Sequence, residues 1–209
     1  MLLLKITKGG DLLLIKNCAT VSQGVVLSRV LTLPSSNAIE ISLYTMKEMN
    51  DSLGVEYHGS VEKLKEVLIL KEKAKDLPIT RVGMVLVNLT GHRAVSVRPE
   101  HIGRLIPSNF AIIEPRDNIN PTYLEWYFNE HPSCRKQLRI ATQGSIVPAL
   151  SIQMLRAIRI ELPTIRQQQT ISNMNRILDQ KKRLVYERLD LEEQLVKELT
   201  LRYIKEDPK

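Results

Sequence analysis

The sequence predicts an α+β fold, with a mixed, strand-rich domain over residues 1–162 followed by one long C-terminal α-helix over residues 163–209. Three observations support this fold class. Short β-branched runs alternate with turn residues through much of the first 162 positions. Two stretches among them have the apolar spacing of helices. The stretch from Ile165 to about Lys205 contains neither glycine nor proline and consists largely of good helix formers.

The first part of the chain predicts strands and leaves one stretch open. Residues 25–33 and 39–46 are β-branched and alternating, and a turn cluster over residues 34–37 separates them. Both runs are therefore predicted strands. The charged stretch that begins near Ser60 fits a helix, and equally fits a short strand over residues 67–70.

A hairpin and two further strands are predicted next. Residues 80–97 contain two apolar runs on either side of LTGHR, which predicts a hairpin whose turn uses the backbone freedom of Gly91. Residues 109–115 (NFAIIEP) predict another strand. Residues 158–162 alternate in the same way, and Pro163 ends that strand.

Two helices are predicted before the last strand. Asn120 is a good N-cap and Pro121 suits the first helical position, so a helix begins there and ends before Gly144. Its apolar residues fall on or near one face, and they are Leu124, Tyr127, Phe128 and Leu138. Ser151 is expected to cap a short second helix that carries Ile152, Leu155 and Arg156.

The long helix has a predicted cap and an unusually wide apolar surface. Thr164 and Gln167 form a capping box, in which each side chain bonds the other residue's backbone N–H, and Gln168 and Gln169 follow in the first turn. One apolar stripe follows the heptad repeat and consists of Ile171, Leu178, Val185, Leu189, Val196 and Leu199. A second, adjacent stripe consists of Ile177, Leu184, Leu191 and Leu195.

This helix is too long for one small domain to cover. About 40 residues at about 1.5 Å each give a helix of about 60 Å. We therefore expect an antiparallel coiled coil with another helix, most simply that of a second copy of the chain.

The composition is that of a folded protein, and the net charge is compatible with contact to a phosphate backbone. The net charge of +7 is spread, with +4 in residues 1–150 and +3 in residues 151–209, which suits a phosphate backbone. The two cysteines lack metal-ligand spacing, and the first residues lack the pattern of a signal peptide. No apolar run approaches the ~20 residues of a membrane helix. We expect a reduced, cytoplasmic protein without membrane contact.

Four blocks, in order, resemble the specificity subunit of type I restriction–modification systems. They are ITRVGMVLVNLTGHRAVSV, IPSNFAIIEPRDNINPTYLEWYF, TQGSIVPALS and IRIELPTIRQQQTI. In that family a Gly-Asp pair usually precedes the first strand, and a Glu-Gln pair opens the long helix. Here Met84 replaces the Asp, and Gln167 replaces the Glu while Gln168 matches the Gln. The resemblance covers residues 79–199 well and residues 1–78 weakly.

The resemblance implies a function and a set of partners. Residues 1–162 would form a target recognition domain that binds double-stranded DNA, and residues 163–209 would form a spacer and dimerisation segment. Family members have two such domains separated by two antiparallel helices, so this chain resembles half a subunit that works as a homodimer. An adenine methyltransferase subunit and a restriction translocase subunit are the implied partners. The departure at Met84 and the weak match of residues 1–78 leave one alternative open, a scaffold protein derived from the family that no longer binds specific DNA.

Side chains suited to DNA recognition gather in two places. Directional donors read base edges, and cations hold phosphates. The candidate DNA contacts are Asn88, Thr90, His92 and Arg93 at the predicted hairpin tip, and Arg135, Lys136, Arg139, Thr142, Gln143 and Ser145 at a helix end and its following loop. For any single residue, an ordinary solvated surface is the alternative interpretation.

No catalytic residue, metal site or cofactor is predicted. Residues 120–123 (NPTY) are similar to the loop with which amino-methyltransferases hold the target amine, but Thr122 departs from that loop and a helix start explains Asn120 and Pro121. The four histidines lack metal-ligand spacing, and no nucleotide-binding loop is present in the sequence.

Overall fold

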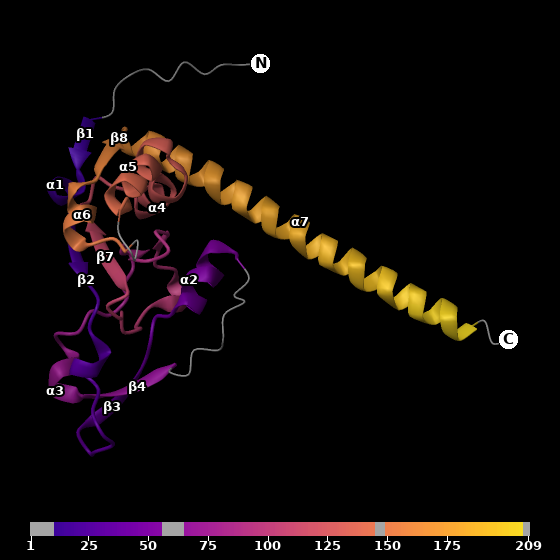
Figure 1. Cartoon of the computed structure of the whole chain (residues 1–209), viewed down its shortest axis with the longest axis horizontal. Coiled ribbons are helices and arrows are strands. Elements are labelled where there is room, and N and C mark those ends of the chain that lie inside the picture. Colours follow the sequence, from indigo (N-terminus) through magenta and orange to yellow (C-terminus); the bar gives the residue numbers. More distant parts are fainter. Residues whose placement is uncertain (1–10, 56–64, 145–148, 207–209) are drawn as a thin grey trace. The chain divides into compact units, whose positions relative to one another are not determined.

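The computed structural model describes residues 11–55, 65–144 and 149–206 (Figure 1). The chain divides into unit 1, which ends at Ser172, and unit 2, which begins at Asn173. Unit 1 mixes strands and helices, and unit 2 is the greater part of one long helix, so the predicted α+β class is confirmed. Within the described ranges, no helix has the length and apolar character needed to span a membrane.

A four-stranded antiparallel sheet lies at the centre of unit 1. Its strands, in spatial order, are β2 (Ala19–Gln23), β7 (Phe110–Pro115), β5 (Val85–Asn88) and β6 (Ala94–Ser96). The predicted hairpin is therefore confirmed as β5 and β6, with Val85 opposite Ser96. The strand predicted over residues 109–115 is confirmed as β7.

Both faces of this sheet are covered, which explains its unbroken apolar runs. Val85 and Val87 of β5 belong to the larger core, together with residues of the helices that follow β7. Leu86 faces the opposite way, into a second core that contains Tyr44 and Met49. Met49 belongs to α2 (Met46–Leu53). A strand buried on both faces needs no polar alternation.

The predicted helix after Asn120 is two helices, α4 (Pro121–Glu130) and α5 (Pro132–Thr142). The Asn120 side chain caps α4 as predicted, accepting from the N–H groups of Thr122 and Tyr123 at 2.9 and 3.2 Å. The break falls at His131, whose ψ of 124° is extended. Pro132 causes it, because proline has no N–H for the helix ladder and disfavours the helical conformation of the residue before it.

A second, two-stranded sheet joins the beginning of the described chain to its later part. β1 (Asp11–Leu14) pairs antiparallel with β8 (Arg159–Leu162), and α1 (Ile15–Cys18) links β1 to β2. The strand predicted over residues 158–162 is confirmed as β8. The short helix before it is confirmed as α6 (Ile152–Ala157), and the Ser151 hydroxyl accepts from the Met154 N–H at 3.1 Å.

The third sheet has its own small core. Figure 1 shows its strands at the end of unit 1 away from α5. β3 (Ala38–Ser42) pairs with β4 (Glu66–Leu70), and α3 (Lys71–Ala74) follows. Of the two alternatives for this stretch, the strand over residues 67–70 is therefore confirmed. The helix start near Ser60 lies outside the described residues. A 3₁₀ turn, η2 (Pro99–His101), follows β6.

Two strand predictions near the start were wrong in whole or in part. Residues 25–33 contain the 3₁₀ turn η1 (Leu27–Arg29), and Leu31 makes only an isolated bridge to Ile69. Residues 39–46 are strand only as far as Ser42. Thr45 forms a capping box with Glu48 and begins α2, so the local cap overrides the β-branched pattern.

The long helix is confirmed as α7 (Ile165–Glu206). Its predicted capping box is also confirmed. The Thr164 N–H donates to Gln167 Oε1 at 3.1 Å, and the Gln167 N–H donates to Thr164 Oγ1 at 3.4 Å. The first two turns belong to unit 1, where Gln168 and Ser172 are buried.

Both cysteines are buried and free. Desolvation by burial raises the pKa of Cys134 to about 12, and it raises the pKa of Cys18 as well. At neutral pH the reactive thiolate form is therefore scarce, and both residues act as small apolar side chains of the core.

Candidate nucleic-acid interface

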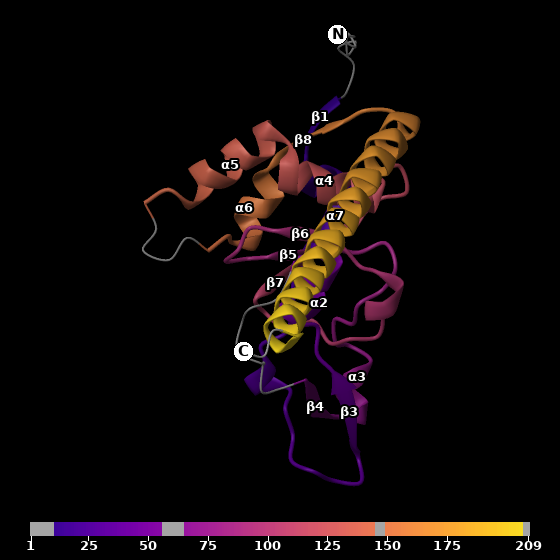
Figure 2. The same cartoon turned by 90° about the vertical axis from the view of Figure 1, so that its right-hand side faces the viewer.

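The two predicted clusters meet at one pocket of unit 1. This larger pocket has a volume of about 560 Å³ and is lined by the hairpin turn, the end of α4 and one side of α5. His92 and Arg93 line it from the hairpin, and Arg135 and Arg139 line it from α5. Figure 2 shows the β5–β6 hairpin and α5 extending to the same side of the unit.

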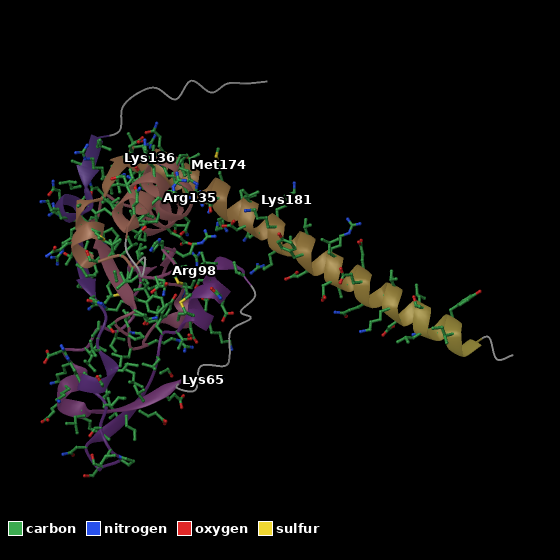
Figure 3. The ribbon with its side chains drawn as sticks, viewed as in Figure 1. Lys65, Arg98, Arg135, Lys136, Met174 and Lys181 are labelled. Carbon is green, nitrogen blue, oxygen red and sulfur yellow. The ribbon has the colours of Figure 1, made fainter. Side chains whose placement is uncertain are left out.

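A smaller pocket of about 430 Å³ continues along α5. Lys136, Arg139, Thr142 and Gln143 line it together with Ile140. Seven of the ten predicted residues line these pockets, and Arg139 lines both. Asn88 and Thr90 line neither pocket, and Ser145 lies outside the described residues. Figure 3 shows Arg135 and Lys136 next to each other on α5.

The cationic face of α5 follows from its sequence pattern. Cys134 and Leu138, one turn apart, are buried and fix the inner side of the helix. Arg135, Lys136 and Arg139 occupy the outer side and are exposed. The helix has no acidic residue. Three cations on one face are an arrangement that attracts phosphate groups.

The hairpin is held in place by two polar side chains of α4. The Asn129 side chain accepts from the Ala94 N–H at 2.9 Å and donates to the Ala94 C=O at 2.7 Å. Glu125 Oε2 accepts from the Ser96 N–H at 3.0 Å, and its other oxygen pairs with Arg98 at 2.9 Å. β6 is an edge strand, so these bonds satisfy backbone groups that would otherwise lie open.

Sequence reasoning missed Glu125 and Asn129. They are 7% and 8% exposed, and they lie four residues apart on the buried side of α4. Polar side chains spaced by one turn among the apolar positions of a predicted helix were the available signal.

Asn88 has a structural role within the hairpin. It is 6% exposed, its Oδ1 accepts from the Gly91 N–H, and its Nδ2 donates to Met46 Sδ at 3.1 Å. We therefore leave Asn88 out of the proposed DNA contacts. The backbone freedom predicted for Gly91 is not used in the turn, because His92 and not Gly91 holds the left-handed conformation, with a φ of 54°. A Cβ at Gly91 would lie 3.0 Å from Asn88 Oδ1, which is closer than ordinary van der Waals contact.

The other predicted residues differ in accessibility. Exposed side chains are those of Thr90, Arg93, Arg135, Lys136, Arg139 and Gln143, and half-buried ones are those of His92 and Thr142. The Thr142 hydroxyl donates to the Leu138 C=O at 3.0 Å. Ser145 lies outside the described residues. No group of three or more metal-ligating side chains occurs among the residues that the structure describes.

Gln168 has a structural role that the sequence alone did not reveal. It is 2% exposed, and its Oε1 accepts from the Asn120 N–H at 2.9 Å. Its Nε2 donates to the C=O groups of Asn118 and Pro163 at 3.2 and 2.9 Å. One side chain thus fastens the first turn of α7 to the N-terminus of α4. Gln169 is exposed, as expected for a residue that faces solvent.

The part of α7 in unit 2 exposes many large apolar side chains. Five residues of the predicted dimerisation stripe are 47–63% exposed, and they are Leu178, Val185, Leu189, Val196 and Leu199. The sixth, Ile171, is half-buried against the larger core of unit 1. The second stripe is exposed as well, with Ile177, Leu184, Leu191 and Leu195 at 56–64%.

No family model and no curated protein matches the chain. Solved structures match it in fold. One comes from a study of complex assembly and conformational transition of the type I restriction–modification system, with a TM-score of 0.64, 16% identity, and coverage of 96% of this chain and 49% of that chain.

Two other solved structures are type I specificity subunits. For the S subunit from M. genitalium the TM-score is 0.57 at 11% identity, covering 94% of this chain and 46% of that chain. For the HsdS subunit from Thermoanaerobacter tengcongensis the values are 0.53 and 13%, covering 88% and 41%. The resemblance to this family is confirmed at the level of the fold, and the chain spans about half the length of these proteins.

Proposed function

We propose that the chain is the DNA-recognition, or specificity, subunit of a type I restriction–modification complex in the cytoplasm. The observation that supports this proposal most is the pair of pockets lined by cations. Residues of both predicted clusters line them, on a fold similar to that of type I specificity subunits. In this proposal the chain is not itself catalytic. It directs an adenine methyltransferase subunit and a restriction translocase subunit to a bipartite site, with residues 1–162 as the target recognition domain.

Two kinds of side chain along the two pockets divide the work of binding. Arg135, Lys136 and Arg139 extend from the outer face of α5, where their charges meet phosphates. Arg93 and Gln143 offer planar, directional donors at the two ends of the region, and such groups read base edges. Phosphate contacts then set the position of the domain on DNA, and base contacts set its preference.

Residues 163–209 are proposed to pair two copies of the chain. Each solved specificity subunit contains about twice as much chain as this protein, so two copies would supply two recognition domains. The exposed stripe of α7 provides the apolar surface that an antiparallel pair of helices buries. Identical domains related by a two-fold axis read an inverted repeat.

Gln143 and Lys136 provide a matched test, because both line the smaller pocket. Gln143→Ala should change the sequence preference of the chain, at a cost of about 1–3 kcal/mol for the preferred site. Lys136→Ala should weaken binding to all sequences alike and lower the salt slope of log K by about one. Selection from a random duplex library, followed by salt titrations, measures both effects.

The same titrations address the alternative of a scaffold protein that no longer binds specific DNA. Such a protein would bind selected and bulk duplexes equally, and neither substitution would alter a preference. A preference that changes with Lys136→Ala and not with Gln143→Ala would contradict the assigned roles.

A further inference from the structure

Glu130 is an unexpected residue in a surface built for phosphates. Among the described residues that line the larger pocket, it carries the only carboxylate. Its Oε1 lies 3.9 Å from Arg93 Nη1, and the two side chains are 54% and 55% exposed. An exposed pair at this distance contributes little to stability. A carboxylate also repels phosphates, so backbone binding does not explain Glu130 either.

The backbone around this pair is rigidly placed. Asn129, which precedes Glu130, makes two hydrogen bonds with the backbone of Ala94, which follows Arg93. Asn129 is 8% exposed and Ala94 is fully buried. The structure therefore fixes where both side chains begin and leaves their charged ends in solvent, an arrangement suited to a recognition site.

The pair matches the major-groove edge of one base pair. In a G·C pair, guanine offers the acceptors N7 and O6, and cytosine offers the N4 donor beside them. O6 and N4 are hydrogen-bonded to each other, so they lie about 2.9 Å apart. Arginine donates and carboxylate accepts, and the nearest atoms of Arg93 and Glu130 lie 3.9 Å apart, so the two side chains can reach neighbouring groups of one base pair.

We propose that Arg93 and Glu130 together read one G·C pair, with Arg93 donating to guanine O6 and N7 and Glu130 accepting from cytosine N4. This inference rests on the proposed DNA-recognition function. Glu130 adds to the discrimination that Arg93 supplies, because the reversed C·G pair sets the carboxylate against guanine acceptors. An A·T pair sets it against thymine O4 and sets Arg93 against the adenine N6 donor.

Glu130→Ala in the full chain tests this assignment. From a random duplex library, the wild-type chain should select a motif with an invariant G·C pair. The variant should lose the preference for that pair by about 10-fold while keeping the other positions of the motif. Arg93→Ala should affect the same position. The Glu130→Ala variant should also bind bulk DNA at least as tightly as wild type, since the carboxylate that repels phosphates is gone.

Glu114→Ala is the matched control. Glu114 forms the other exposed Arg–Glu pair of the described sheet region, with Arg81 Nη2 at 2.8 Å, and the substitution changes the net charge equally. It lies near the opposite end of β5 and β7 from the hairpin turn. We expect the wild-type motif from this variant, and a melting temperature for Glu130→Ala that equals that of wild type.

The possible outcomes distinguish a failure of the Arg93–Glu130 assignment from a failure of the proposed DNA-recognition function. A wild-type motif that Glu130→Ala leaves unchanged, or weakens equally at every position, overturns the shared reading of one base pair. So does a result in which Arg93→Ala and Glu130→Ala affect different positions. A wild-type chain that selects no motif overturns the proposed function itself.

Discussion

A chain carrying both Val185→Asp and Leu189→Asp should be a monomer of 23.9 kDa, whereas the wild-type chain should have twice that mass. Val185 and Leu189 are 47% and 49% exposed in the single chain and lie one turn apart on the same stripe. In the proposed helix pair both would be buried. Carboxylates without partners are costly to bury, so the substitutions should disperse the dimer. Light scattering at micromolar concentration measures the mass.

Gln180→Asp with Gln194→Asp is the control for this prediction. Both positions face away from the stripe on a helix of 3.6 residues per turn, and the variant gains the same negative charge. It should stay dimeric. Because the substitutions lie in unit 2, the melting of unit 1 should not change in either variant. A Val185→Asp, Leu189→Asp chain with the wild-type mass would show that this stripe is not the interface.

Replacing Gln168 with Ala should destabilise unit 1 far more than the same change at either neighbouring glutamine. The change removes the partner of one backbone N–H and of two backbone C=O groups at a site that is 2% exposed. Leaving such groups unsatisfied costs about 2–4 kcal/mol in the free energy of unfolding. Calorimetry should show the melting temperature fall by about 2–4 °C per kcal/mol.

The three consecutive glutamines supply their own controls. Gln167→Ala removes half of a capping box and should cost about 1 kcal/mol. Gln169→Ala alters only an exposed side chain and should cost nothing measurable. Hydrogen exchange of the Asn120 backbone N–H reports on this contact directly, because Gln168 Oε1 is its acceptor. Equal effects at Gln168 and Gln169, or unchanged exchange at Asn120, would contradict the assigned role.

The sequence predicts this fold best where a local rule acts alone. Asn120 caps α4, Ser151 caps α6 and Thr164 caps α7, each as residue type and spacing predict. It predicts least where two rules compete. Residues 39–46 have a strand pattern, but the capping box of Thr45 and Glu48 begins α2 before that run ends.

The residue types of the candidate site could be predicted from the sequence, but much of their arrangement in space could not. Exposed cations on α5 follow from the spacing of Cys134 and Leu138. That α5 and the hairpin line one pocket depends on Asn129 and Ala94, which are 35 residues apart in the sequence. The roles of Gln168, Asn88 and Glu130 likewise depend on partners distant in sequence or on burial, and neither is visible in a local pattern.

In the proposed assembly, one recognition domain and one helix make half of a bipartite DNA reader. Sequencing of methylated adenines, in cells that produce this chain together with the proposed adenine methyltransferase partner, tests it most directly. The 42 residues of α7 give a helix of about 63 Å, which limits the gap between half-sites to fewer than about 18 base pairs at about 3.4 Å each. We expect methylation at an inverted repeat with a fixed gap within that limit. Methylation at a site without two-fold symmetry, or no methylation that depends on this chain, would contradict this assembly.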